Sequence, residues 1–179
     1  MHSALRRMRT LFRVAPGLAG AAICVLGLLG LLIEEPYWRD VGHGPTWFTW
    51  TTWTVMLLTG PVALLARLEA SAVTIQPELH FVLEHVLWAG LAILEWRLLL
   101  GTAARVSPTR WRTVMAVGLS VAGVLAGLAS WRTRWPLVYA GESVSWGLMD
   151  RPVALFGLAV LPVLWLWAQQ QSRRVLPDP

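Results

Sequence analysis

The sequence predicts an all-α fold, a polytopic integral membrane helix bundle of about five transmembrane helices. Of its 179 residues, 56% are hydrophobic and 14% are charged, whereas a soluble domain carries about 25% charged residues. Its apolar runs are near the roughly 20 residues that cross a bilayer, and helices satisfy their own backbone hydrogen bonds in lipid. This composition excludes a soluble enzyme, a disordered tail and a disulfide scaffold, since Cys24 is the single cysteine.

Residues 1–14 form a basic N-terminal cap with four arginines, and an apolar run over 15–33 follows it. A basic segment before an apolar run is typical of a signal peptide. This run, however, is about 19 residues long, which is enough to span a bilayer. The segment IEEPYW then follows in place of a small-residue cleavage site. We therefore expect an uncleaved first helix with a cytoplasmic N-terminus.

Four further apolar runs complete a single membrane domain over 15–168. We expect them as helices at 46–66, 79–100, 112–130 and 152–168, followed by a polar tail over 169–179. Pro61 and Pro162 lie inside two of these runs. Proline removes a helix hydrogen bond, so we expect a kink or a lined cavity at each position.

The arginines indicate the location and orientation of the chain. All 15 cationic residues are arginine, and they lie mainly at the ends of apolar runs. This pattern favours contact with anionic lipids and not with nucleic acid. We expect several crossings of a bacterial inner membrane. Five helices would put Arg105, Arg110 and Arg112 outside, against the positive-inside tendency, so the count is open by one helix.

The run over 112–130 has a face of small residues. Gly123 and Gly127 form a GxxxG motif, which lets two membrane helices approach closely. The motif predicts a helix–helix contact, either within the chain or in a homo-dimer or larger complex.

The run over 79–100 carries ionisable residues, which are costly in a membrane and mark functional sites by default. A stripe along one helix face has steps of four, four, three and four residues. Its members are His80, Glu84, Trp88, Leu91 and Glu95. Glu84 and Glu95 are about 16 Å apart along the helix axis, too far to act as one carboxylate pair.

Three roles are open for this stripe and for His85 beside it. The histidines and Glu84 can pair within the bundle as structural groups. Alternatively, His80 or His85 ligates a haem or a chlorophyll-type pigment. The third role is a proton or substrate path. A metal site shared with His43 is the weakest alternative, because His80 and His85 are about 140° apart around the helix.

The run over 46–66 begins with closely spaced tryptophans. Trp47, Trp50 and Trp53 recur every three residues. They predict either an interfacial aromatic girdle or an aromatic wall on which a flat apolar ligand stacks.

The start of this run resembles the tryptophan-rich sensory protein, or translocator protein, family over about residues 45–69. The matching residues are Pro45, Trp47, Trp53, Thr54, Gly60 and the pair Leu68–Glu69. The resemblance implies five membrane helices that bind porphyrins and other apolar ligands between the first, second and fifth helices, often as a dimer.

Two function classes remain open. The first is an apolar-ligand binding protein, acting as a sensor or as an accessory subunit of a respiratory or photosynthetic complex, with a tetrapyrrole (haem, porphyrin or chlorophyll-type) as the candidate ligand. Its site residues are His80, His85, Glu84, Trp88, Glu95, Trp47, Trp50 and Trp53. The second is a small membrane enzyme or transporter that uses Glu84, His85 and Glu95 in proton transfer. We assign no catalytic or metal-binding residue.

Overall fold

The computed structural model describes residues 2–41, 46–60, 62–71, 77–107, 109–139 and 147–175. These residues form helices and no strand, which confirms the predicted all-α bundle. The helices are α1 (His2–Val41), α2 (Thr46–Thr59), α3 (Val62–Ser71), α4 (Pro77–Arg105), α5 (Arg110–Tyr139) and α6 (Gly147–Val175).

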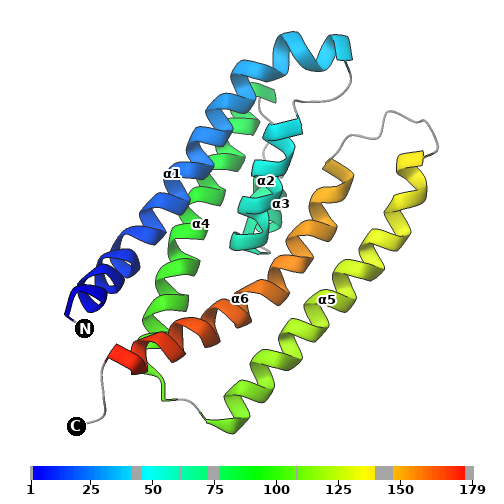
Figure 1. Ribbon diagram of the computed structural model, residues 1–179. Helices are drawn as coiled ribbons and strands as arrows, with labels where there is room; N and C mark the ends of the chain where they lie inside the picture. The colour runs from blue at the N-terminus through cyan, green and yellow to red at the C-terminus, as the bar shows by residue number, and fades with distance from the viewer. Residues whose placement is uncertain are drawn as a thin grey trace.

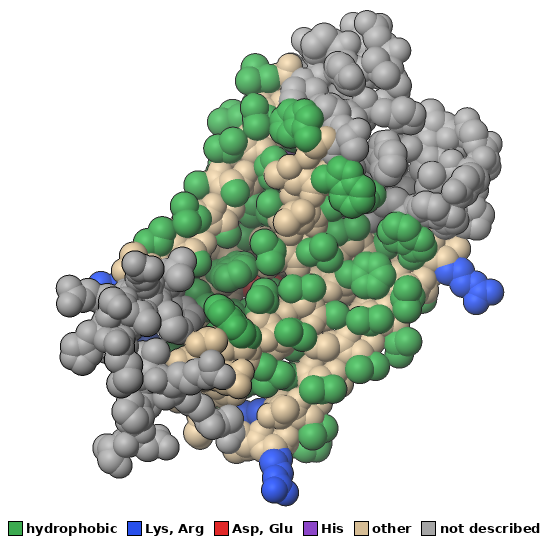
Figure 2. Space-filling view, in the orientation of Figure 1, with side chains coloured by type: hydrophobic (Ala, Val, Ile, Leu, Met, Phe, Trp, Pro, Cys, Tyr) green, Lys and Arg blue, Asp and Glu red, His purple; other side chains and the backbone are tan. Residues whose placement is uncertain are grey.

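Four helices in the described part are long and apolar enough to cross a membrane. Their apolar segments are Arg13–Gly30 in α1, Val82–Arg105 in α4, Arg110–Thr133 in α5 and Arg151–Ser172 in α6. In Figure 1 these helices lie roughly in a row in the order α1, α4, α6 and α5, and each packs on the next. Their apolar outer surfaces (Figure 2) indicate a membrane protein.

The helices extend past the apolar runs that predicted them. Most of the basic cap at 1–14 belongs to α1, and α6 continues through the expected polar tail as far as Val175. The last four residues of that tail lie outside the described part. Apolar runs mark only the stretch that lipid covers, whereas a helix continues wherever its backbone hydrogen bonds do.

The expected second spanning helix at 46–66 is two short helices instead. Gly60 separates them, with a left-handed backbone (φ 55°), and its N–H donates to the carbonyl of Met56 at 2.8 Å. This is a common way for a helix to end. Pro61 comes next in the sequence and cannot continue the hydrogen-bonding pattern of α2. The prediction of one continuous helix was therefore wrong.

The chain reverses at this break, so that α2 and α3 form a hairpin beside one half of the bundle (Figure 1). With 14 and 10 residues, they are about 21 Å and 15 Å long. Both are shorter than the roughly 30 Å hydrocarbon core of a bilayer. Neither helix is therefore long enough to cross a bilayer, and four helices remain that are.

The hairpin packs through small residues. Ala63 and Ala66 of α3 are buried in one cluster with Trp88, Ala89 and Ala92 of α4. Ile23, Met56 and Val153 bring α1, α2 and α6 to the same cluster. Because alanine side chains are short, they let α3 approach α4 closely, and dispersion contacts favour this arrangement in lipid.

The GxxxG motif is used inside the chain. A Cβ atom on Gly123 would lie 2.6 Å from the backbone nitrogen of Ala159, and one on Gly127 would lie 2.6 Å from the ring of Phe156. Both glycines face α6, which leaves no room for a second chain at this face. Of the two alternatives that the motif left open, the structure therefore supports the internal contact.

The two ends of the bundle differ. α1 and α5 begin, and α4 and α6 end, at the same end of the molecule (Figure 1). We call it the arginine end, after Arg13, Arg105, Arg110 and Arg112, and we call the opposite end, where α2 begins, the hairpin end. α6 bends near its middle, where Pro162 lies, as expected for a proline inside a helix.

Candidate functional site

The tip of the α2–α3 hairpin lies at mid-depth of the bundle. The indole Nε1–H of Trp88 donates to Thr59 Oγ1 at 3.0 Å, and that of Trp96 donates to the carbonyl of Leu58 at 3.1 Å. Trp88 is about 17 Å from the start of α4, and Trp96 is about 14 Å from its end, at 1.5 Å per residue. The tip therefore sits far from both ends of a spanning helix.

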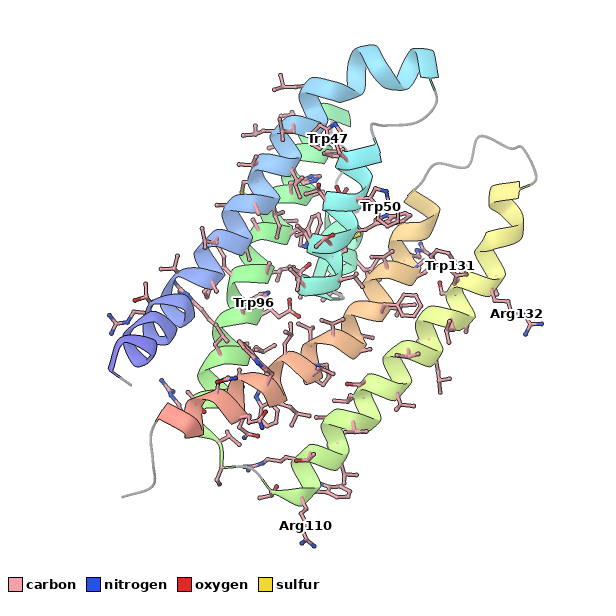
Figure 3. The ribbon with its side chains drawn as sticks, viewed as in Figure 1. Trp47, Trp50, Trp96, Arg110, Trp131 and Arg132 are labelled. Carbon is pink, nitrogen blue, oxygen red and sulfur yellow. The ribbon has the colours of Figure 1, made fainter. Side chains whose placement is uncertain are left out.

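These two bonds pair polar groups that the end of a helix would otherwise leave unpaired in an apolar region. The last carbonyls of a helix have no partner within it, and such groups are costly in lipid. Trp96 satisfies the Leu58 carbonyl from α4. Thr59 Oγ1 accepts from Trp88 and itself donates to the Val55 carbonyl at 2.8 Å. Figure 3 shows Trp96 on α4 near the tip.

Two glycines allow α6 to cross the tip. A Cβ atom on Gly157 would overlap the Cα of Gly60, and one on Gly60 would lie 2.6 Å from the side chain of Leu161. Glycine is required at position 60 for a second reason, because its positive φ is strained for other residues. Backbone therefore meets backbone where α6 passes the hairpin.

Glu95 lies beside this crossing. Its Oε1 would be 3.6 Å from a Cβ atom on Gly60. Its Oε2 is buried and has no hydrogen-bond partner among the described residues. Arg97 is close in sequence, but it lies about 200° further around the helix and is exposed. One carboxyl group thus faces the tip of a broken helix without a neutralising partner for this oxygen.

Glu95 is also reachable from outside the bundle. Its side chain is only partly buried, although Oε2 itself is covered. The site therefore lies between the buried core and the outer surface of the molecule.

Glu84 and His85 lie nearer the hairpin end and are more deeply buried, with 9% and 7% of their surfaces exposed. Both side chains take part in interactions within the structure. The His85 ring lies 5.8 Å from that of Trp88, and a Cβ atom on Gly27 would come within 2.7 Å of it. α1 thus covers the His85 ring closely.

The structure describes most of the predicted stripe on α4. Glu84, Trp88 and Glu95 face the interior, as their common helix face predicts, although they lie at different depths. The side chain of His80 lies outside the described residues. Among those residues, no group of three or more His, Cys, Asp or Glu side chains is placed to hold a metal ion.

The tryptophans of α2 differ in their surroundings, because Trp53 packs against the core cluster that contains Trp88, whereas Trp47 and Trp50 are exposed. Trp50 is 61% exposed and meets Trp53 edge to face at 5.4 Å, and Trp47 is also exposed. Trp88 is only 2% exposed. Figure 3 shows Trp47 and Trp50 on α2, in the half of the bundle near the hairpin end.

Sequence reasoning did not single out Thr59, Trp96 or Gly157. The Gly60–Pro61 pair was the available signal for a turn, because this dipeptide marks chain reversals. It lies inside a run of about 20 apolar residues, and the length of that run favoured one continuous span. Once the turn is placed, the indoles that face it become predictable as hydrogen-bond donors.

A second set of polar contacts joins α4 to α6 nearer the arginine end. Trp165 Nε1–H donates to Thr102 Oγ1 at 3.1 Å, and Gln169 Nε2–H donates to the Val106 carbonyl at 2.7 Å. Gln169 is buried. These bonds fix the two helices together between the tip and the arginine end.

Comparison of the chain with protein-family models, with curated proteins and with solved structures finds no match. The functional argument therefore depends on the geometry of the hairpin tip.

Proposed function

We propose that this protein is a small proton-coupled transporter of a bacterial inner membrane, with Glu95 as the group that binds and releases the proton. The observation that carries this proposal is the buried Oε2 of Glu95, which has no partner beside a helix break at mid-depth. An ionisable group inside a membrane is costly, so it is a functional candidate by default.

The broken helix supports a transport role. Non-helical backbone at membrane depth is tolerated where it is buried in protein or lines a cavity. Transporters place interrupted helices at their substrate sites near the bilayer midplane. Here the break at Gly60 and the carboxyl group of Glu95 lie together at that depth.

We place Glu84 and His85 on the approach to Glu95 from the hairpin end. They lie on the same helix and are buried. About 16 Å separates Glu84 from Glu95 along the axis, so a proton cannot pass directly between the two carboxyl groups. Water or the transported solute must carry it over this distance.

The test compares wild type with Glu95→Gln in liposomes that contain a trapped pH-sensitive dye. A potassium-diffusion potential drives protons inward, and infrared spectra of the same samples record the titration of carboxyl groups. Arg97→Gln is the matched control, since Arg97 is exposed and two residues away.

We expect Glu95→Gln to remove one titrating carboxyl band and to reduce proton flux to that of protein-free liposomes, while Arg97→Gln retains both. Loss of the band without any wild-type flux would still support proton binding and would indicate strict coupling to a solute. A carboxyl spectrum that Glu95→Gln leaves unchanged would overturn the proposal.

A second candidate function is the binding of a flat apolar ligand, with a tetrapyrrole as the first to test. The supporting observation is the edge-to-face pair of the exposed Trp50 and the partly buried Trp53, whose rings offer stacking surfaces. Ligation by His85 would require α1 to move, because Gly27 covers its ring. An absorption spectrum of the purified protein tests this candidate. A bound tetrapyrrole predicts a Soret band that His85→Ala removes, and a colourless protein contradicts it.

We also propose that the N-terminus is cytoplasmic. Four arginines precede or begin the apolar segment of α1, and positive residues favour the cytoplasmic side.

A further inference from the structure

The hairpin changes the number of membrane crossings from odd to even. α2 and α3 together return to the side from which they came, so α1, α4, α5 and α6 are the four helices that cross. The start of α1, the turn between α4 and α5, and the end of α6 consequently share one side. Five full spans would have put that turn and the end of α6 on the side opposite to the start of α1.

With an even number of crossings, most of the positive charge lies at one end of the molecule. The helix ends and the turn at the arginine end hold nine of the 15 arginines. These arginines are Arg6, Arg7, Arg9, Arg13, Arg105, Arg110, Arg112, Arg173 and Arg174. The described helix ends on the opposite side hold five arginines and six acidic residues. The molecule is therefore strongly asymmetric in charge along the membrane normal.

Arginines mark the ends of the apolar segments at this end of the molecule. Three apolar segments begin or end with an arginine at this end, namely Arg13, Arg105 and Arg110. All three side chains are exposed, and Figure 3 shows Arg110 pointing away from the bundle. Trp111, beside it, is 70% exposed, as expected for an aromatic anchor at the membrane interface.

Two hydrogen bonds link residues on either side of the turn between α4 and α5. Arg112 donates through Nη1 to the carbonyl of Ser107, and its backbone N–H donates to Thr109 Oγ1 at 3.4 Å. Guanidinium groups bind phosphate oxygens with charge-assisted hydrogen bonds. The exposed arginines at the ends of the apolar segments therefore match the phosphate groups of an anionic lipid.

We propose that the arginine end is a binding surface for anionic lipid head groups of the cytoplasmic leaflet, with both chain ends on that side and the hairpin inserted from the opposite leaflet. This inference rests on the hairpin and the arginines, and it holds or fails independently of the role of Glu95. Anionic lipid on the cytoplasmic leaflet is the partner that such basic segments favour.

The first test determines which side each end faces. In a Cys24→Ser background, Ser107→Cys marks the arginine end and Thr133→Cys marks the opposite end of α5, since both positions are exposed. A membrane-impermeant thiol reagent is applied to bacterial cells whose outer membrane has been permeabilised and to inverted inner-membrane vesicles. We expect Thr133→Cys to react in cells and Ser107→Cys only in inverted vesicles. The opposite pattern, or reaction of both positions on one side, overturns the proposal.

The second test measures lipid binding. Purified protein is offered phosphatidylglycerol or phosphatidylcholine, and retained lipid is counted by native mass spectrometry. The double variant R110Q/R112Q is compared with R132Q/R151Q, which removes two exposed arginines from the opposite end. We expect about fivefold weaker phosphatidylglycerol retention for each arginine removed from the turn and little change in the control.

Equal retention of the two lipids, or equal losses in the two double variants, would overturn the lipid surface. Inorganic phosphate serves as a competitor. If millimolar phosphate displaces phosphatidylglycerol, the turn binds a free anion, and the assignment to lipid fails.

Discussion

The role proposed for Glu95 comes from its surroundings. Glu84 lies on the same helix and is well buried, but it has partners within the structure. Glu95 is less buried, yet one of its oxygens is covered without a partner. An unsatisfied buried oxygen costs roughly 1–3 kcal/mol, and more when it is charged. Proton binding at mid-depth is the role that we propose for this group.

Gly157 tests the backbone crossing at the level of one residue. We expect Gly157→Ala to destabilise the protein by about 1–3 kcal/mol, because the new methyl group would overlap Gly60 in a packed region. Thermal unfolding in mild detergent measures the change. Gly118→Ala is the matched control, since nothing lies within 4 Å of its added Cβ atom. Equal stability of the two variants would contradict the close approach of α6 to the tip.

The indole of Trp88 tests the support of the tip. We expect Trp88→Phe to cost about 0.5–1.5 kcal/mol beyond its loss of packing, because Thr59 Oγ1 loses a donor. A double-mutant cycle with Thr59→Val isolates this bond, since unrelated losses would add. An interaction energy near zero in detergent unfolding experiments would show that the bond does not stabilise the hairpin.

At the level of elements, the α2–α3 hairpin defines the site. Two helices too short to span are stable here because alanines of α3 pack on α4 and because Trp88 and Trp96 satisfy polar groups at the tip. Helix propensity alone would not hold helices this short, since isolated helices below about 12–15 residues are marginal. Tertiary contacts therefore stabilise the break.

The backbone of Gly60 sets the direction of the hairpin. We expect Gly60→Ala to destabilise the protein by about 1–2 kcal/mol, because alanine is strained at a positive φ. The contact with Leu161 would add to the cost unless this flexible side chain moves. Hydrogen exchange of the α2 and α3 amides should increase, while exchange in α5 stays unchanged. Uniform protection throughout the chain would argue against a turn at this residue.

At the level of the whole molecule, the small-residue face of α5 is occupied by α6. We therefore expect Gly127→Leu to lower thermal stability without changing the oligomeric state, because its side chain would collide with Phe156 of the same chain. Gly118→Leu points into open space and should change neither property. Light scattering in detergent reports the mass of the particle. A dimer that Gly127→Leu dissociates would restore the alternative of an interface through this face.

The orientation of the molecule is also a property of the whole chain. Arg105, Arg110 and Arg112 conflicted with the positive-inside tendency when the sequence was read as five spans. The hairpin removes the conflict, because one crossing fewer puts these three arginines on the same side as the start of α1. Charge statistics and fold then favour the same orientation, which the accessibility of Ser107→Cys and Thr133→Cys will test.

The sequence by itself determined the helical class, the membrane character and the position of the apolar segments, since these follow from composition and from the length of apolar runs. It also placed Glu84 and Glu95 on one face of α4, because helical spacing is a local property. The identity of Glu84 and Glu95 as candidates needed no tertiary information.

Tertiary structure decided the rest. Whether the run over 46–66 spans or turns back depends on Gly157 making room for Gly60 and on α4 supplying donors to Leu58 and Thr59. Those partners lie 29 to 97 residues away in the sequence, so no local pattern contains them. The same packing gives Glu95 and Glu84 different surroundings. It also places the glycines of α5 against α6 of the same chain. Partners brought together by folding decide where a polar group in a membrane is satisfied and where it is left unpaired.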